Sequence, residues 1–275
     1  MPREFCIGAG WKMNKTIAET ETYLHELVTT SLPPDVMIFV APPFTALAAA
    51  KRAIGDAPVY LAAQNMHWAD AGAYTGEISP AMLLDCGVEI VELGHSERRA
   101  HQAETDVTIN AKVHAAIAHR LRPLVCVGEH EYELKAGASV ETVSRQVKLA
   151  FAGLDPEQLG GAIVAYEPIW AIGETGQVAP PAHVSAVLGA LREMLDARGL
   201  PWIPVLYGGS VGPDNAPDLI AIPAVDGLFV GRAAWSAEGF AKVIEAGVAG
   251  RLVRPSSGNE TQPKPSSGLR NASRI

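Results

Sequence analysis

Three side chains suited to moving a proton follow separate apolar runs of the sequence. Glu167 lies among apolar neighbours, where desolvation would raise the pKa of a carboxylate and make it a usable base. His95 precedes a predicted helical turn, whose N-terminus disfavours a charged imidazole and favours a neutral hydrogen-bond donor. Lys12 would place positive charge beside a developing anion, and Glu97 would hold it through a salt bridge. Each residue alone is explained as a surface or packing residue, but together they would suit the removal of a proton and the stabilisation of the anion that forms.

The elements that must position these residues are short, continuously apolar runs rich in β-forming residues. Such runs are typical of strands buried on both faces. Eight of them are spaced along the chain, at residues 5–10, 36–42, 59–64, 88–94, 123–129, 162–168, 203–209 and 226–232.

A helix-like segment follows each predicted strand. The predicted helices span residues 18–31, 45–54, 80–86, 106–120, 139–151, 181–198, 215–220 and 238–246. Eight strand–helix units favour an α/β fold, a single (β/α)₈ barrel over residues 1–250. A two-domain doubly wound protein is the competing interpretation, but no linker interrupts the alternation. Residues 251–275 repeat the tetrapeptide PSSG and are predicted to form a disordered, low-complexity tail.

Active residues of such barrels lie at the carboxyl ends of the strands. Three stretches at the predicted ends are distinctive: WKMN at 11–14, GHSERR at 94–99 and AYEPIWAIG at 165–173. With TGEIS at 75–79 and YGGSV at 207–211, they resemble the triosephosphate isomerase family over residues 5–250. The resemblance implies a cofactor-free, metal-free isomerase that shifts a carbonyl group between adjacent carbons through an enediolate.

The roles of individual residues follow from this resemblance. Glu167 would be the base, with His95, Lys12 and Glu97 as the other catalytic residues. The substrate phosphate has neither a Walker loop nor a GxGxxG motif to bind it. Backbone N–H groups near four residues of the later loops would bind it instead, namely Gly173, Ser210, Gly231 and Arg232.

Two loops complete the expected site. Residues 168–176 resemble the family's mobile lid, with an apparent extra residue near Glu174. Residues 64–79 resemble the loop that inserts into a neighbouring subunit, with Asn65 supporting the loop and Thr75 bracing the partner's site. The resemblance therefore implies a homodimer.

Three departures bear on the substrate. Gly10 stands where the family usually has asparagine, residues 230–235 read VGRAAW in place of a VGGASL-like sequence, and residues 64–70 read QNMHWAD. All three are similar to the family branch that isomerises erythrulose phosphate, and a glycine at position 10 would leave room for one more hydroxymethyl group. The favoured reaction is therefore L-erythrulose 1-phosphate to D-erythrulose 4-phosphate. Triosephosphate isomerisation, and a non-catalytic phosphate-binding barrel, remain the alternatives.

Composition limits the partners. A formal net charge of −8 argues against nucleic acid and anionic membranes, because both bind to basic surfaces. The three cysteines are far apart and have no metal-binding spacing, and His95 and Glu97 lack a third ligand at a useful distance. These features, together with the lack of a leader-like N-terminal segment, predict a cytoplasmic protein. The resemblance implies that its ligand is a small phosphorylated sugar.

Overall fold

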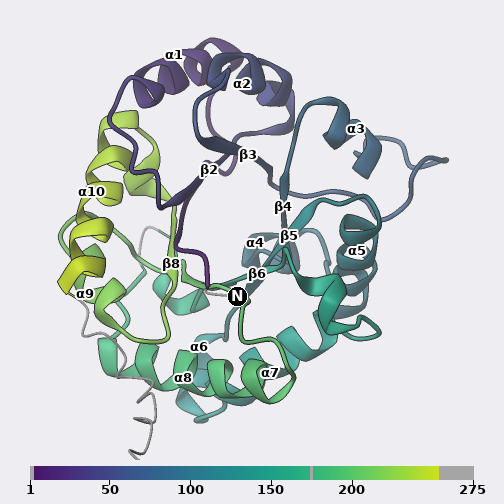
Figure 1. The fold of residues 1–275 in the computed structure, drawn as a ribbon. Coiled ribbons are helices and arrows are strands. Elements are labelled where there is room, and N and C mark those ends of the chain that lie inside the picture. Colours follow the sequence, from purple (N-terminus) through teal and green to yellow (C-terminus); the bar gives the residue numbers. More distant parts are fainter. Residues whose placement is uncertain (1–2, 174–175, 254–275) are drawn as a thin grey trace, which may run out of the picture.

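Parallel strands close into a barrel in the computed structural model, which describes residues 3–173 and 176–253 (Figure 1). Neighbouring strands pair in chain order, and β1 pairs with β8 to close the ring. Within the described residues the eight strands are β1 (Cys6–Gly10), β2 (Met37–Ala41), β3 (Val59–Ala63), β4 (Ile90–Leu93), β5 (Arg122–Val127), β6 (Ile163–Tyr166), β7 (Val205–Tyr207) and β8 (Gly227–Val230). The predicted (β/α)₈ fold is confirmed.

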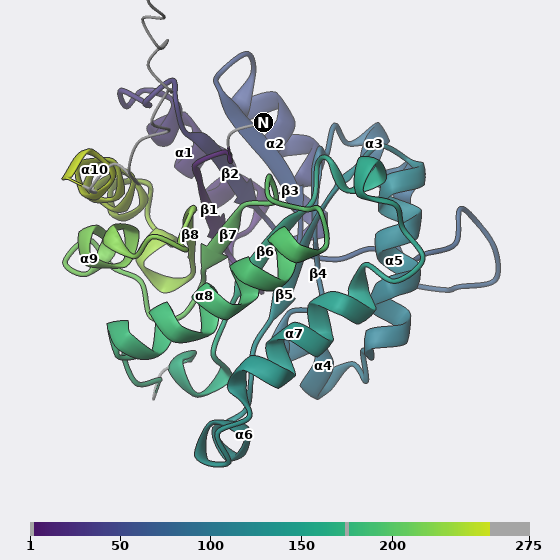
Figure 2. The ribbon, with the colours of Figure 1, turned by 60° about the horizontal axis from the view of Figure 1, so that its bottom comes forward.

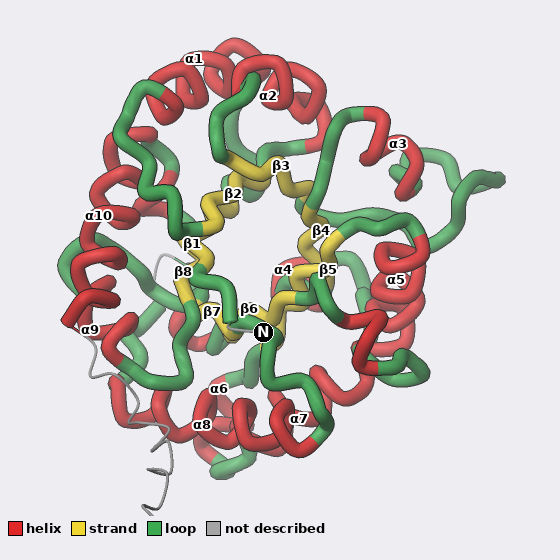
Figure 3. The backbone as a smooth tube through the Cα atoms, viewed as in Figure 1, coloured by secondary structure: helices red, strands yellow, loops and turns green. Residues whose placement is uncertain are grey.

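Helices surround this ring on the outside, as the tube view and the tilted view make clear (Figures 2 and 3). They are α1 (Ile17–Val28), α2 (Leu47–Ile54), α3 (Pro80–Asp85), α4 (Ser96–His101), α5 (Asp106–Ala118), α6 (Glu131–Lys135), α7 (Ser139–Ala150), α8 (Pro181–Ala197), α9 (Ala216–Ala221) and α10 (Ala237–Val253). The short helix α4 is the helical turn predicted after His95, whereas α6 was not predicted. Helix α6 lies in the loop after β5 and has too few residues for an apolar periodicity.

Local sequence explains where several helices begin. Thr16 and Glu19 form a reciprocal capping box at the start of α1. Ser79 caps α3, and Pro80 follows at the first helical position, where the missing N–H group is harmless. These signals lie just after loops from the barrel, so they fix the points at which the chain turns back along its outside.

Strand residues alternate between the barrel interior and the layer beneath the helices. In β4, Ile90 belongs to the interior cluster, with Leu124 of β5, whereas Val91 and Leu93 belong to the larger core that includes the helices. Both faces are therefore buried, which explains why the strands read as continuous apolar runs.

The last helix is longer than predicted. Helix α10 continues to Val253, so the first three residues of the predicted tail are helical, and residues 254–275 lie outside the described residues. Two glycines, Gly247 and Gly250, follow the predicted end of this helix, and glycine has a low helix propensity. The structure gives one of them a packing role, because a Cβ atom on Gly250 would lie 2.6 Å from Pro217 of α9.

Candidate active site

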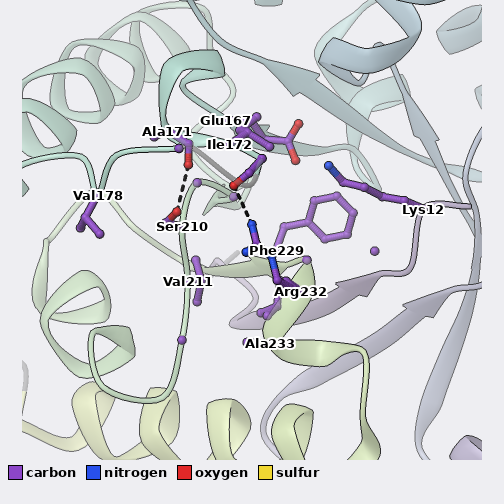
Figure 4. Close-up of a pocket in the computed structure, with 18 of the residues that line it drawn as sticks. Lys12, Glu167, Ala171, Ile172, Val178, Ser210, Val211, Phe229, Arg232 and Ala233 are labelled. Carbon is purple, nitrogen blue, oxygen red and sulfur yellow. Dashed lines mark hydrogen bonds between the residues drawn. The ribbon is translucent and has the colours of Figure 1, made fainter. Parts of the chain in front are cut away.

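A cavity of about 890 Å³ opens at the carboxyl ends of the strands (Figure 4). Two groups of side chains and loops face each other across it. We call Lys12, His95, Glu97 and Glu167 the charged wall, and Gly173, Ser210, Gly231 and Arg232 the loop wall. All eight residues line the cavity, so residues predicted from distant parts of the sequence are brought together.

Glu167 follows β6 directly and is 4% exposed. Its Oε2 atom lies 3.5 Å from His95 Nε2 and has no hydrogen-bond partner among the described residues. Burial raises the pKa of this carboxyl, while the charges of His95 and Lys12 act in the opposite direction. The result is a desolvated carboxyl group at the cavity lining, with one oxygen free to accept a proton.

The orientation of His95 is set by the turn that follows it. Its Nδ1 atom accepts a hydrogen bond from the backbone N–H of Glu97 at 3.2 Å, at the start of α4. A backbone N–H can only donate, so Nδ1 must carry the lone pair and a neutral ring must carry its proton on Nε2. That proton is on the nitrogen near Glu167, where it can be donated to a substrate oxygen.

Lys12 adopts an unusual backbone conformation, with a φ of 53° in the left-handed region. A lysine in that region costs about 1 kcal/mol or more, and such strain is characteristic of functional sites. Gln64 Nε2 donates to the Lys12 carbonyl oxygen at 2.8 Å, which helps hold this turn. The Lys12 ammonium donates to Glu97 Oε1 at 2.6 Å, so the predicted salt bridge is confirmed. Although partial burial acts in the opposite direction, the hydrogen bond from Lys12 lowers the pKa of Glu97.

Gly10 lines the cavity at the end of β1, as expected, but the space beside it is partly filled. A Cβ atom built on Gly10 would lie 3.0 Å from Cζ of Phe229, an aromatic side chain from the neighbouring strand β8. The Phe229 ring therefore occupies part of the space that the missing side chain at Gly10 leaves. The sequence did not predict this contact, because the two residues are far apart in the chain.

The loop wall is built differently, from backbone groups and two polar side chains. The hydroxyl of Ser210 donates to the carbonyl oxygen of Ala171 at 3.1 Å, and Arg232 Nη2 donates to the carbonyl oxygen of Gly173 at 2.6 Å (Figure 4). Both acceptors belong to the predicted lid. Residues 174–175, where the extra lid residue is expected, lie outside the described residues.

The base of the lid is fixed by a buried carboxylate. Glu129 is fully buried after β5, and its Oε1 atom accepts hydrogen bonds from Trp170 Nε1 at 2.9 Å and from the hydroxyl of Tyr166 at 3.1 Å. His183 Nε2 lies 3.1 Å from the same oxygen. Glu129 therefore holds Trp170, in the first part of the predicted lid, and does not line the cavity.

The two residues predicted to act through the dimer loop lie away from the cavity lining. Asn65 is buried, and its Oδ1 atom accepts a hydrogen bond at 2.8 Å from Lys112, which also pairs with Glu104. Thr75 is exposed on a loop that projects from the barrel (Figure 2). Asn65 thus anchors the base of the loop, and Lys112, in the middle of α5, is a support that no sequence motif indicated.

Comparison with known proteins fits this geometry. The sequence model described as "Triosephosphate isomerase" matches residues 5–247. The chain belongs to the triosephosphate isomerase family. The L-erythrulose-1-phosphate isomerase of Rhizobium rhizogenes (strain K84 / ATCC BAA-868) is 45% identical over 247 residues, which cover 87% of this chain and 93% of that protein.

Other relatives of this family carry the same name. The L-erythrulose-1-phosphate isomerase of Brucella abortus (strain 2308) is 45% identical over 248 residues, covering 88% of this chain and 95% of that protein. That of Mycolicibacterium smegmatis is 46% identical over 247 residues, covering 88% of this chain and 93% of that protein. The prediction of an intramolecular isomerase of the triosephosphate isomerase family is confirmed.

Three residues that sequence reasoning missed surround Glu167. Gly208 leaves space for it, because a Cβ atom there would lie 2.8 Å from Glu167 Cγ. Glu92 lines the cavity from within β4, and the thiol of Cys126 interacts with the carboxyls of both Glu92 and Glu167. Glu92 and Cys126 lie inside apolar strand runs. Only the alternation of side chains between the two faces of a strand identifies them as facing the barrel interior.

Two features of the described residues bear on other classes of protein. Among the described residues, no group of three or more histidine, cysteine, aspartate or glutamate side chains is arranged to hold a metal ion. In the same ranges, none of the helices combines the length and the apolar character needed to cross a membrane.

Proposed function

We propose that this isomerase interconverts L-erythrulose 1-phosphate and D-erythrulose 4-phosphate. The observation that carries the chemistry is the unpaired Glu167 oxygen 3.5 Å from His95 Nε2, in a cavity that Lys12 also lines. The observation that supports the substrate is the name of the relatives, which are 44–47% identical over most of the chain.

The reaction moves two protons. Glu167 takes the proton from C3 of L-erythrulose 1-phosphate, giving an enediolate across C2 and C3, and returns it to C2. The C3 hydroxyl loses its proton and the C2 oxygen gains one, with His95 Nε2–H as donor to these oxygens. The product has its carbonyl at the former C3, which is D-erythrulose 4-phosphate after renumbering. Lys12 stabilises the negative charge of the intermediate, and Glu97 positions Lys12.

The phosphate group is assigned to the loop wall, which lies across the cavity from the base. Backbone N–H groups near Gly173, Ser210 and Gly231 would bind the phosphate oxygens, and the Arg232 guanidinium would add positive charge in a protein of net charge −8. Arg232 already bonds the lid at Gly173, so phosphate binding and lid position are coupled.

A homodimer in the cytoplasm is part of the same proposal. The exposed loop tip that carries Thr75, and the 95% exposure of Met13 beside the site, support contact with a second copy of the chain. Thr75 of the partner subunit would then brace Lys12 and His95. Free Cys6, Cys86 and Cys126 support a reducing compartment.

The decisive experiment compares kcat/KM for L-erythrulose 1-phosphate and dihydroxyacetone phosphate on one preparation. We expect the tetrulose phosphate to be preferred by at least about tenfold, the smallest effect of one fitted methylene group. A preference for the triose phosphate would make this chain a triosephosphate isomerase. Rates equal to background on both substrates would indicate a non-catalytic phosphate-binding barrel.

A further inference from the structure

Glu92 is a charged residue within a buried strand. It belongs to β4, and its neighbours Val91 and Leu93 lie on the outer side, in the core beneath the helices. By alternation, Glu92 faces the barrel interior, and it lines the same cavity as Gly10, His95 and Glu167. It is 5% exposed, so a carboxyl group has been placed where the rest of the strand is apolar.

The hydrogen-bonding capacity of this carboxyl is largely unused. Within residues 3–173 and 176–253, the hydrogen bond recorded for it is a long one, from the thiol of Cys126 to Oε1 at 3.8 Å. A thiol is a weak donor, and buried polar groups in proteins normally have better partners. A carboxyl group that lines a cavity and has only a weak hydrogen-bond partner among the described residues is available to a ligand.

The charged groups around Glu92 define what kind of ligand it can bind. Burial raises the pKa of Glu92 to about 7. The charge of His95 lowers this pKa and that of Glu167 raises it. Lys12 also lowers the pKa and Glu97 also raises it, both with smaller effects. Near neutral pH the carboxyl is therefore partly protonated and can both accept and donate a hydrogen bond. A phosphate or an enediolate would be repelled by its ionised form, whereas a neutral hydroxyl group fits both forms.

We propose that Glu92 determines specificity for the four-carbon substrate by hydrogen bonding the terminal hydroxyl group of L-erythrulose 1-phosphate. This inference rests on the proposed function. The other polar groups of that substrate have partners: the phosphate meets the loop wall, and the C2 and C3 oxygens meet His95 and Lys12. The terminal hydroxyl is the group that a triose phosphate lacks and that remains unassigned.

Gly10 and Glu92 then divide the recognition of the additional hydroxymethyl group. Gly10 leaves space for the extra carbon beside the Phe229 ring, and Glu92 supplies a partner for its oxygen. Selection by hydrogen bonding is stronger than selection by space, because a buried carboxyl left without its partner is penalised when the wrong substrate binds.

The test compares Glu92→Leu and Glu92→Gln with the unaltered enzyme on both substrates. We expect Glu92→Leu to lower kcat/KM for L-erythrulose 1-phosphate about 10- to 100-fold, the usual range for one hydrogen bond to a buried ionisable group. Turnover of dihydroxyacetone phosphate should stay unchanged or rise, because that substrate has no terminal hydroxyl to lose and its binding no longer leaves a buried carboxyl without a partner. Glu92→Gln keeps a hydrogen-bonding side chain and should retain most of the tetrulose activity.

A chemical deletion gives the complementary measurement. The 4-deoxy analogue of L-erythrulose 1-phosphate lacks the terminal hydroxyl, so the unaltered enzyme should turn it over more slowly by the same factor that Glu92→Leu loses. The Glu92→Leu enzyme should no longer distinguish the analogue from the parent compound. This non-additivity is the signature of a direct interaction between the two groups.

A matched control is Leu124→Ile, at the β5 residue paired with Glu92, which lies inside the barrel but does not line the cavity. It should leave the ratio of the two substrates unchanged, and thermal unfolding verifies that each variant is folded. Equal losses on both substrates, with a shifted pH profile, would mean that Glu92 acts only through Glu167 and would overturn the inference. Full tetrulose activity in Glu92→Leu would also overturn it. If the unaltered enzyme does not turn over the tetrulose phosphate, the proposed function itself fails, and the inference fails with it.

Discussion

The two walls of the cavity are built by different means. The charged wall uses side chains at the ends of β1, β4 and β6, where Glu167 is 4% exposed and the charges lie close enough to shift one another's pKa. The loop wall uses backbone groups after β6, β7 and β8, and its two polar side chains bond to the lid. Proton transfer requires rigid, desolvated groups, whereas binding of a phosphate requires donors that can close around it.

The largest expected effect is on the charged wall. Glu167→Gln removes the proposed base while keeping the shape of the side chain, so kcat should fall by about 10²- to 10⁴-fold. Because the loop wall is untouched, KM should change little. Steady-state kinetics on L-erythrulose 1-phosphate measure both values, with Glu129→Gln, which alters a buried carboxylate outside the cavity lining, as the comparison variant. Near-normal turnover by Glu167→Gln would exclude it as the base.

The pH dependence should also originate on the charged wall. The proposed base Glu167 can accept a proton only when ionised, and burial raises its pKa above that of an ordinary glutamate. Activity should therefore be full above the raised pKa and fall about tenfold per pH unit below it. The acidic limb of kcat/KM for the free enzyme should consequently lie above pH 4.5, the ordinary value for this group. A limb at or below that value would show that desolvation does not operate on this residue.

The substrate preference should respond to the space at Gly10. Gly10→Asn should lower the ratio of kcat/KM for the tetrulose over the triose phosphate by about tenfold or more, since one methylene group in a pocket has effects of that size. The Phe229 ring must move to admit the side chain, so Gly10→Asn/Phe229→Leu should recover triose activity better than the single variant. Phe229→Leu alone is the control. A ratio unaffected by both Gly10 variants would show that this position does not select the substrate.

The smallest effect is expected on the loop wall. Arg232→Ala removes one hydrogen bond to the lid and one positive charge, which should raise KM by about 3- to 10-fold and leave kcat within a few-fold. Ser210→Ala removes an uncharged hydrogen bond to the lid and should have the weaker effect. If Arg232→Ala lowered kcat as severely as Glu167→Gln, the division of labour between the two walls would be wrong.

Much of this architecture was predictable from the sequence. Continuous apolar runs predict strands buried on both faces, and a barrel brings their carboxyl ends to one mouth, so Lys12, His95 and Glu167 could be placed together. Glu92 was missed because it interrupts an apolar run and follows no motif. Its position facing the cavity follows from the alternation of side chains along β4, but only once Val91 and Leu93 are known to lie on the outer side.

Other features depend on contacts between distant segments. The proximity of Phe229 to Gly10 arises from the closure of β8 against β1, which no local pattern records. Helix α10 runs past its predicted end at residue 246. Gly247 and Gly250 are weak helix formers, but a Cβ atom on Gly247 would lie 3.0 Å from Ile7 of β1, and one on Gly250 would lie 2.6 Å from Pro217 of α9. Tertiary packing decided both.

The thiol of Cys126 has a consequence for the chemical durability of the site. Burial and the neighbouring carboxyls of Glu167 and Glu92 raise its pKa well above the ordinary range, which disfavours the reactive thiolate. A sulfur atom in contact with both acids is thereby protected from alkylation and oxidation. The folded enzyme should keep its activity in iodoacetamide or dilute peroxide under conditions that modify Cys126 in the unfolded chain, and loss of activity that tracks labelling of this cysteine would refute that protection.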